Sequence, residues 1–191
     1  MAATSKGNVR EAILLAAREA AMAYGYGGLN FRDLAEAVGV KAASINYHFA
    51  TKAQLGEAVA QRYWEDIAHD LEAISTNARS PTEALQRYPS IFRLSLERDN
   101  RMCLSSFMAT ERDELPEPVL KEVQAFADVN TAWLREHLVA AELASPAEAE
   151  LRARAVYAAV AGAQIIARSR SDVKLFDELI ESYRRMGLLP S

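Results

Sequence analysis

The feature that most constrains the fold of this chain is a long row of apolar residues at helical spacing in its first half. Successive members are three or four residues apart, which places them on one face of an α-helix and excludes the two-residue alternation of a half-buried strand. The row consists of Leu55, Val59, Tyr63, Ile67, Leu71 and Ile74. A helix with so long an apolar face must be packed along most of its length, so the row predicts a helical bundle.

The remaining segments have the same character. Ala, Leu, Glu and Arg dominate, β-branched residues are sparse, and Gly and Pro separate the helical stretches. We therefore predict an all-α fold of nine helices without strands. The expected helices cover about residues 8–24, 31–38, 41–48, a long fourth from 52, 82–98, 101–111, a seventh that ends near 143, 145–168 and 172–186.

The totals restrict the class of protein. A chain of 191 residues can bury a sufficient core without disulfides or metals, and the single cysteine, Cys103, cannot form an internal bridge. The N-terminus lacks the pattern of a secretion signal, and no apolar run approaches the roughly 20 residues that span a bilayer. We expect a cytoplasmic protein with no metal, no cofactor and no membrane partner.

The stretch from Asn30 to Lys52 carries the most specific pattern. It predicts two short helices joined by a tight turn at Gly39, braced by the helix before them, which is the layout of a helix-turn-helix. Apolar or small residues stand where the two helices must touch. The outward positions carry small or hydrogen-bonding residues, namely Lys41, Ala42, Ser44, Tyr47 and His48. Such a helix can approach the edges of DNA bases closely.

Charge supports this interpretation weakly. Residues 1–52 contain six basic and four acidic side chains, which leaves a net charge of −6 for the rest of a chain whose total is −4. A slightly basic segment attached to an acidic body suits a protein that touches phosphate with one end only.

Several elements recur in register with one known family. The segments in question are Gly25-Tyr26, Asn30–Ala35, Gly39-Val40, Tyr47-His48-Phe49 and Lys52–Leu55. Over about residues 8–60 they resemble the N-terminal signature of the tetracycline-repressor-like (TetR/AcrR) regulators. The chain departs from the signature at Asn46, where the family usually has Tyr, at Ala21, where a Phe is frequent, and at Asn30, where Thr is usual.

The resemblance implies a function. Residues 1–52 would be a helix-turn-helix DNA-binding domain, and residues 53–191 a helical effector-binding and dimerisation domain. The protein would be a ligand-responsive transcriptional regulator, by family habit a repressor, that binds palindromic double-stranded operator DNA as a homodimer. A small-molecule effector would release it from the DNA.

When the resemblance is carried over residue by residue, it implies which side chains contact DNA bases and which contact phosphates. Base edges would be reached by Ala42, Ala43 and Ser44. Phosphates would be held by Asn30 and Arg32 at a helix start and by Tyr47, His48 and Lys52 beside the groove. Lys41 completes the predicted DNA-binding set. The alternative for Tyr47 and His48 is packing against the first helix, and for Ser44 an ordinary solvated position.

The second half is less informative. An effector pocket would be lined by aromatic, sulfur-containing and polar residues of the middle helices, and ordinary core packing is the alternative for each of them. The predicted pocket residues are Phe92, Met102, Cys103, Phe107, Met108, Phe126, Trp133, Tyr157 and Gln164. The stretch 151–168 is rich in small residues, which permit close helix approach. The resemblance implies that the last two helices form the dimer interface, with packing inside the monomer core as the alternative. The predicted interface residues are Ala155, Ala158, Gly162, Leu175, Leu179, Ile180 and Tyr183.

Cys103 allows a sharper hypothesis. Arg101 and a helix start lie close in sequence, both of which favour the thiolate, and the segment is similar to a cysteine-bearing segment of family members that sense electrophiles or oxidants. The alternative is a small buried core residue, because free cysteine is among the most buried residue types.

Two rival functions are weighed. Catalysis is not expected, because the sequence contains no metal-binding His or Cys spacing, no phosphate-binding glycine loop and no nucleophile elbow. The other rival is a helical interaction module whose helix-turn-helix binds a protein partner. The outward face of its second helix carries one lysine, Lys41, which fits that alternative, whereas the flanking Arg32 and Lys52 favour DNA.

Overall fold

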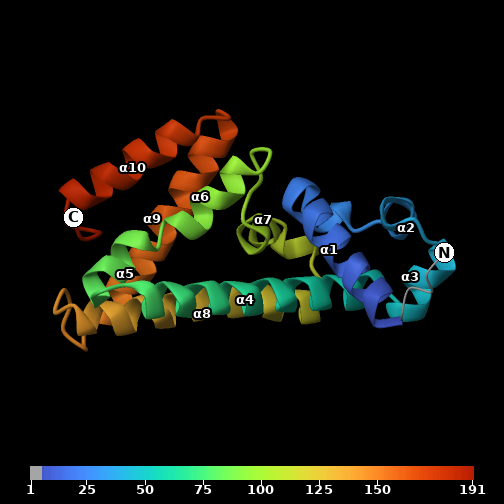
Figure 1. Ribbon diagram of the computed structural model, residues 1–191, viewed down its shortest axis with the longest axis horizontal. Helices are drawn as coiled ribbons and strands as arrows, with labels where there is room; N and C mark the ends of the chain where they lie inside the picture. The colour runs from blue at the N-terminus through green and yellow to red at the C-terminus, as the bar shows by residue number, and fades with distance from the viewer. Residues whose placement is uncertain (1–5) are drawn as a thin grey trace. The chain divides into compact units, whose positions relative to one another are not determined.

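The computed structural model describes residues 6–191, and every regular element in that range is helical (Figure 1). The all-helical prediction is confirmed. The α-helices are α1 (Lys6–Tyr24), α2 (Phe31–Val38), α3 (Ala42–His48), α4 (Lys52–Asn77), α5 (Pro81–Arg87), α6 (Ser90–Glu97), α7 (Leu104–Thr110), α8 (Glu117–Ala140), α9 (Ala149–Ser169) and α10 (Val173–Arg185). Two short 3₁₀ turns, η1 (Tyr26–Gly28) and η2 (Arg112–Glu114), separate some of them.

The chain divides into two compact units, each with its own interior. The N-terminal unit comprises the chain up to Trp64 together with Leu104–Gln124, and the C-terminal unit comprises Glu65–Cys103 and Ala125–Ser191. Helices α4 and α8 therefore each contribute residues to both units. The boundary predicted at residue 52 divides the chain by function, not by contacts, and stays a prediction. The first five residues of the predicted N-terminal domain lie outside the described range.

The N-terminal unit is built on α1. Ile13 and Ala17 are completely buried on one face of this helix, four residues apart as helical packing requires. Helices α2 and α7 both contact α1, and α3 contacts α2. Figure 1 shows α2 and α3 as two consecutive short helices after α1. The long α4 supplies the apolar row anticipated from the sequence, and Leu55, Val59 and Tyr63 of this unit are buried.

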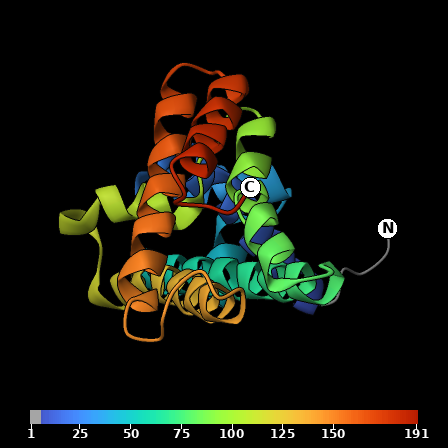
Figure 2. The same ribbon diagram turned by 90° about the vertical axis from the view of Figure 1, so that its left-hand side faces the viewer.

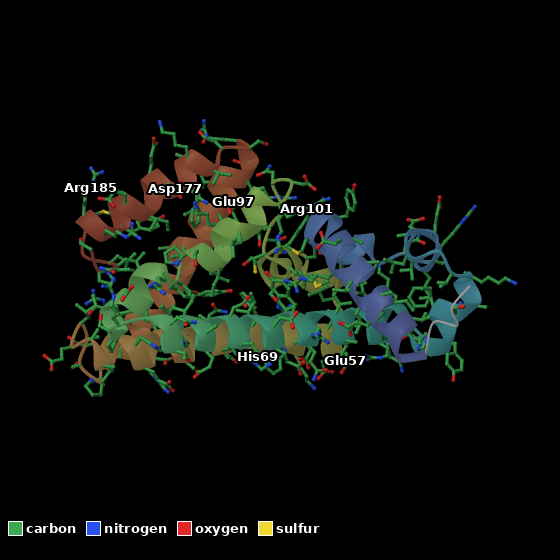
Figure 3. The ribbon with its side chains drawn as sticks, in the orientation of Figure 1. Glu57, His69, Glu97, Arg101, Asp177 and Arg185 are labelled. Carbon is green, nitrogen blue, oxygen red and sulfur yellow. The ribbon has the colours of Figure 1, made fainter. Side chains whose placement is uncertain are left out.

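The C-terminal unit contains a layer of three helices. Helices α9 and α10 lie side by side and both contact α6, as Figure 2 shows. Arg93 of α6 fastens α10 through a bidentate ion pair with Asp177, at 2.7 Å from Nε to Oδ1 and 3.0 Å from Nη2 to Oδ2. The same guanidinium also contacts Glu97, and Figure 3 labels both carboxylates.

One expected helix is interrupted. The sequence predicts a single helix over residues 82–98, whereas α5 ends at Arg87 and α6 begins at Ser90. Pro89 stands between them, and a proline ring has no N–H to donate and collides with the carbonyl four residues earlier. The chain resumes from there, since Phe92 and Arg93 donate to the Pro89 carbonyl. The other eight expected helices are present as single α-helices in the described range.

Candidate DNA-binding site

Helix α2 begins and ends through local hydrogen bonds. The side chain of Asn30 caps its start, with Oδ1 accepting from the N–H groups of Arg32 at 2.9 Å and Asp33 at 3.3 Å. Gly39 ends it with φ of 74°, a left-handed conformation that residues with a Cβ adopt at a cost. The Val40 N–H then bonds back to the Ala35 carbonyl, which closes the turn.

Helix α3 is anchored from one side and open on the other. Ile45 and Phe49 are buried, and the guanidinium of Arg10 lies 5.3 Å from the Phe49 ring centroid. Lys41, the N-cap position, and Ala42 and Ala43 in the first turn are all exposed. The buried anchors thus hold a helix whose other face is small and accessible.

The predicted DNA-binding residues all lie in the N-terminal unit, on α2 and α3, at the N-cap positions of these two helices, or at the start of α4. The exposed members are Asn30, Arg32, Lys41, Ala42, Ala43 and Tyr47. The partly covered members are Ser44, His48 and Lys52. Tyr47 is 68% exposed and meets the ring of His48 edge-on at 5.1 Å, so the outward position expected for Tyr47 agrees with its exposure.

A concavity of about 350 Å³ lies between the start of α2 and the turn that leads into α4. Its lining residues are Gly27, Leu29, Asn30, Phe31, Ala50, Thr51 and Lys52. One wall is the N-terminus of α2, where the helix dipole favours an anion. Lys52 also lines the concavity and carries a positive charge, so the concavity suits a phosphate group.

The sequence predicts Thr51 as the cap of α4, but it did not reveal Gln54 and Tyr26 as further supports of this site. Thr51 Oγ1 accepts from the Gln54 N–H at 3.2 Å, while Gln54 Oε1 accepts from the Ala50 N–H at 3.0 Å, an exchange that fixes the start of α4. The Thr51-x-x-Gln54 spacing is a readable signal for such a cap. The Lys52 ammonium lies 4.4 Å from the centroid of the Tyr26 ring, and burial raises the pKa of that phenol above its ordinary value.

The predicted pocket residues divide between the two units. Phe107 and Met108 belong to the N-terminal unit, and the other seven belong to the C-terminal unit. There, Phe92, Phe126 and Tyr157 form a cluster with ring centroids 6.3 to 6.5 Å apart, and the Trp133 ring stacks on Tyr88 at 5.7 Å. Burial, followed by the neighbouring Tyr157 and Cys103, raises the pKa of Tyr88 well above its usual value.

Gln164 is completely buried at the edge of this cluster. Its Oε1 accepts from the Cys103 N–H at 3.2 Å, and its Nε2 donates to the Phe92 carbonyl at 2.7 Å. Cys103 itself is only 2% exposed, which agrees with the alternative of a buried core residue; its role as a sensor stays a hypothesis. Met102 is buried beside it in the chain.

The predicted interface residues of α9 lie on an exposed apolar row. Ala155 and Ala158 are exposed and Gly162 is half-buried, and the row continues in side chains that the sequence reasoning omitted: Leu151, Ile165 and Ile166. On α10, Leu175, Leu179 and Tyr183 are half-buried. Ile180 differs, because it is 4% exposed and lines a groove of the same unit together with Phe176 and Ile74. Within the chain Ile180 is therefore a core residue.

None of the helices in the described range combines the length and apolar character needed to cross a bilayer.

Comparison with known proteins identifies the helix-turn-helix segment. A model of the tetR family of bacterial regulatory proteins matches residues 13–59. That range includes α2, α3, the turn between them and most of α1. No curated protein matches the sequence.

Solved structures match nearly the whole chain. A TetR transcriptional regulator from Legionella pneumophila is 28% identical, with a TM-score of 0.86 over 92% of this chain and 95% of that chain. A TetR-family regulator from Agrobacterium tumefaciens is 25% identical, with a TM-score of 0.87 over 95% and 98% of the two chains. The reduced form of E. coli NemR, 18% identical, shares the fold with a TM-score of 0.80 over 93% and 96%. The helix-turn-helix of this chain thus belongs to the tetR family of bacterial regulatory proteins, and its complete fold is that of TetR-family transcriptional regulators.

Proposed function

We propose that this protein represses transcription by binding a palindromic operator as a homodimer, and that a small-molecule effector releases it. The observation that carries the proposal is the open face of α3, where Ala42 and Ala43 are exposed beside the concavity at Lys52. Side chains this small let a helix backbone enter the major groove, while the flanking cations hold phosphates.

The residues then take distinct roles. Ala42, Ala43 and Ser44 meet base edges, and a methyl group among them suits contact with a thymine methyl. Arg32 and Lys41 are exposed cations on either side of the turn and bind phosphate. The partly covered Lys52 binds a phosphate seated in the concavity, with the help of the helix dipole at the start of α2.

The exposed row on α9 supports a dimer. Leu151 is 76% exposed, and Ile165 and Ile166 are also largely open to solvent. Burying such side chains against a second copy gains roughly 25 cal/mol per Å² of apolar surface, and Ala158 and Gly162 permit close helix approach. One helix-turn-helix reads too few base pairs for specificity in a genome, so a two-fold pair is required in any case.

The aromatic cluster of the C-terminal unit supports an effector site. Phe92, Phe126 and Tyr157 offer flat apolar surfaces, which suit a ligand with an aromatic or extended apolar body. An effector releases the operator only if it binds the released state more tightly, and a tenfold loss of operator affinity needs about 1.4 kcal/mol of coupling.

The test is binding to DNA from the region upstream of the protein's own gene, measured with excess nonspecific competitor across a range of salt. Saturable binding of two protomers per site that survives competitor is expected. Arg32→Ala should weaken binding and reduce the slope of log K against log salt by about 0.9, the value of one phosphate contact. Lys121→Ala is the matched control, because it removes an exposed lysine of α8 in the same unit.

The other outcomes decide between the alternatives. Binding that falls equally on all sequences as salt rises would reduce the interaction to phosphate attraction. Absence of binding at low salt would favour the protein-interaction module, since the outward face of α3 carries little charge.

A further inference from the structure

A carboxylate from a distant part of the sequence holds the turn in front of α2. Glu111 follows α7, and its Oε2 accepts a hydrogen bond from the Tyr26 N–H at 2.7 Å, across 85 residues of sequence. Both residues belong to the N-terminal unit. Hydrogen bonds to a charged acceptor are stronger than neutral ones, so this contact is a substantial restraint on a three-residue turn.

The turn is shaped to receive that carboxylate. A Cβ built on Gly25 would lie 2.3 Å from each of the two carboxylate oxygens of Glu111, far closer than any non-bonded contact allows. Gly25 also has φ of 65° and ψ of −157°, a conformation open mainly to glycine. The missing side chain of Gly25 and its backbone conformation therefore both allow the Glu111 carboxylate to lie against this turn.

Tyr26 transmits this restraint to the proposed DNA contacts. Its ring lies under the Lys52 ammonium at 4.4 Å and against Gly56 of α4, where an added Cβ would approach Tyr26 Cε2 to 2.8 Å. The Tyr26 carbonyl accepts from the Leu29 N–H, immediately before the cap residue Asn30. A shift of Tyr26 would therefore move both walls of the concavity that Asn30 and Lys52 line.

We propose that Glu111 is a positioning residue for operator binding. It holds the Gly25-Tyr26 turn, and thereby sets the distance between the start of α2 and Lys52 to one that accommodates a DNA phosphate. Glu111 acts through the backbone and not by contact with DNA. This role rests on the proposed operator binding and assigns a determinant of affinity outside the helix-turn-helix.

The experiment compares Glu111→Ala and Glu111→Gln with the wild-type protein. Glu114→Gln is the matched control, because Glu114 is an exposed carboxylate three residues later in the same segment. Operator affinity is measured well below the thermal midpoint, with the active fraction determined by stoichiometric titration. Exchange of the Tyr26 amide hydrogen is followed by NMR on the free proteins.

Glu111→Ala should raise the operator Kd about tenfold, the loss expected for one charge-assisted hydrogen bond, and Glu111→Gln should have a smaller effect. Tyr26 amide exchange should accelerate in the same order, and Glu114→Gln should match the wild type in both measurements. A merely structural role would lower the thermal midpoint or the active fraction while leaving the Kd of the folded protein unchanged.

Two results would overturn the proposal, and they differ in scope. If the wild-type protein binds operator and both Glu111 variants bind it with the same Kd, although their Tyr26 amides exchange faster, only the role of Glu111 is removed. A wild-type protein that shows no sequence-specific binding removes the operator-binding function and the role of Glu111 together. Should Glu111→Ala fail to fold, the Glu111→Gln measurements decide the first of these questions.

Discussion

The short helices of the helix-turn-helix are capped by local hydrogen bonds, whereas the interior of the C-terminal unit is joined by hydrogen bonds between distant segments. In the helix-turn-helix, Asn30 caps α2 through residues two and three positions later, and Thr51 and Gln54 cap α4 across three and four. In the C-terminal unit, Gln164 bonds to groups 61 and 72 residues away, and Arg93 pairs with Asp177 across 84. The helices of the helix-turn-helix are therefore specified by neighbouring residues, whereas the interior of the C-terminal unit depends on distant segments that folding brings together.

The largest expected effect lies in the C-terminal unit. Gln164→Leu keeps a side chain of similar size but leaves the Cys103 N–H and the Phe92 carbonyl buried without partners. Each unsatisfied group costs roughly 1–3 kcal/mol, so we expect a loss of about 3 kcal/mol in the free energy of unfolding by urea. Gln124→Leu, at an exposed position of α8, is the control and should change stability by less than about 0.5 kcal/mol. Equal stability of the two variants would show that the long-range hydrogen bonds of Gln164 contribute little to the stability of the fold.

A smaller effect is expected at the turn of the helix-turn-helix. Gly39→Ala places a Cβ on a backbone with φ of 74°, at a cost of roughly 1–2 kcal/mol, although no atom lies within 4 Å to obstruct it. Gly39→Asn should lose less, because Asn tolerates this conformation. Thermal unfolding checks the order, with Gly27→Ala as the control at an unobstructed glycine of η1. If Asn were no better than Ala, the strain would not originate in the backbone conformation.

The smallest effect is expected at the helix cap. Asn30→Ala removes the acceptor for two backbone N–H groups and should destabilise the protein by about 1 kcal/mol, while Asn30→Ser should retain most of the stability. Denaturant unfolding at constant m-value measures both. A loss from Asn30→Ala as large as that from Gln164→Leu would mean that local and long-range hydrogen bonds contribute equally to the stability of this protein.

The same difference explains what the sequence could predict. The limits of α2 at Phe31 and Val38 agree with the expected helix, because Asn30 and Gly39 act on their nearest neighbours. The break at Pro89 could also have been anticipated from the proline alone. The start of α7 at Leu104 rather than near residue 101 could not, since the preceding loop includes Asp99 and Asn100 in left-handed conformations and is held by Gln164.

The candidate site shows the same limit. Exposed residues such as Ala42 and Tyr47 were assigned from the motif, and their exposure agrees with that assignment. The Glu111 contact to Tyr26 has no pattern in the sequence, because 85 residues separate the two groups. The predicted pocket likewise mixed Phe107 and Met108 of one unit with seven residues of the other, since helical periodicity does not tell which unit a helix face joins.

The composition of the N-terminal unit has a consequence for the protein during its synthesis. This unit is completed by Leu104–Gln124, so a nascent chain that ends at Trp64 already contains the whole helix-turn-helix but lacks Glu111 and the buried Val119. The ribosome must add about sixty more residues before the support of the recognition turn exists. Under the proposed function, competence to bind DNA is thus delayed until the chain has been synthesised as far as Gln124, and an aborted or prematurely cleaved product would carry the motif without its support.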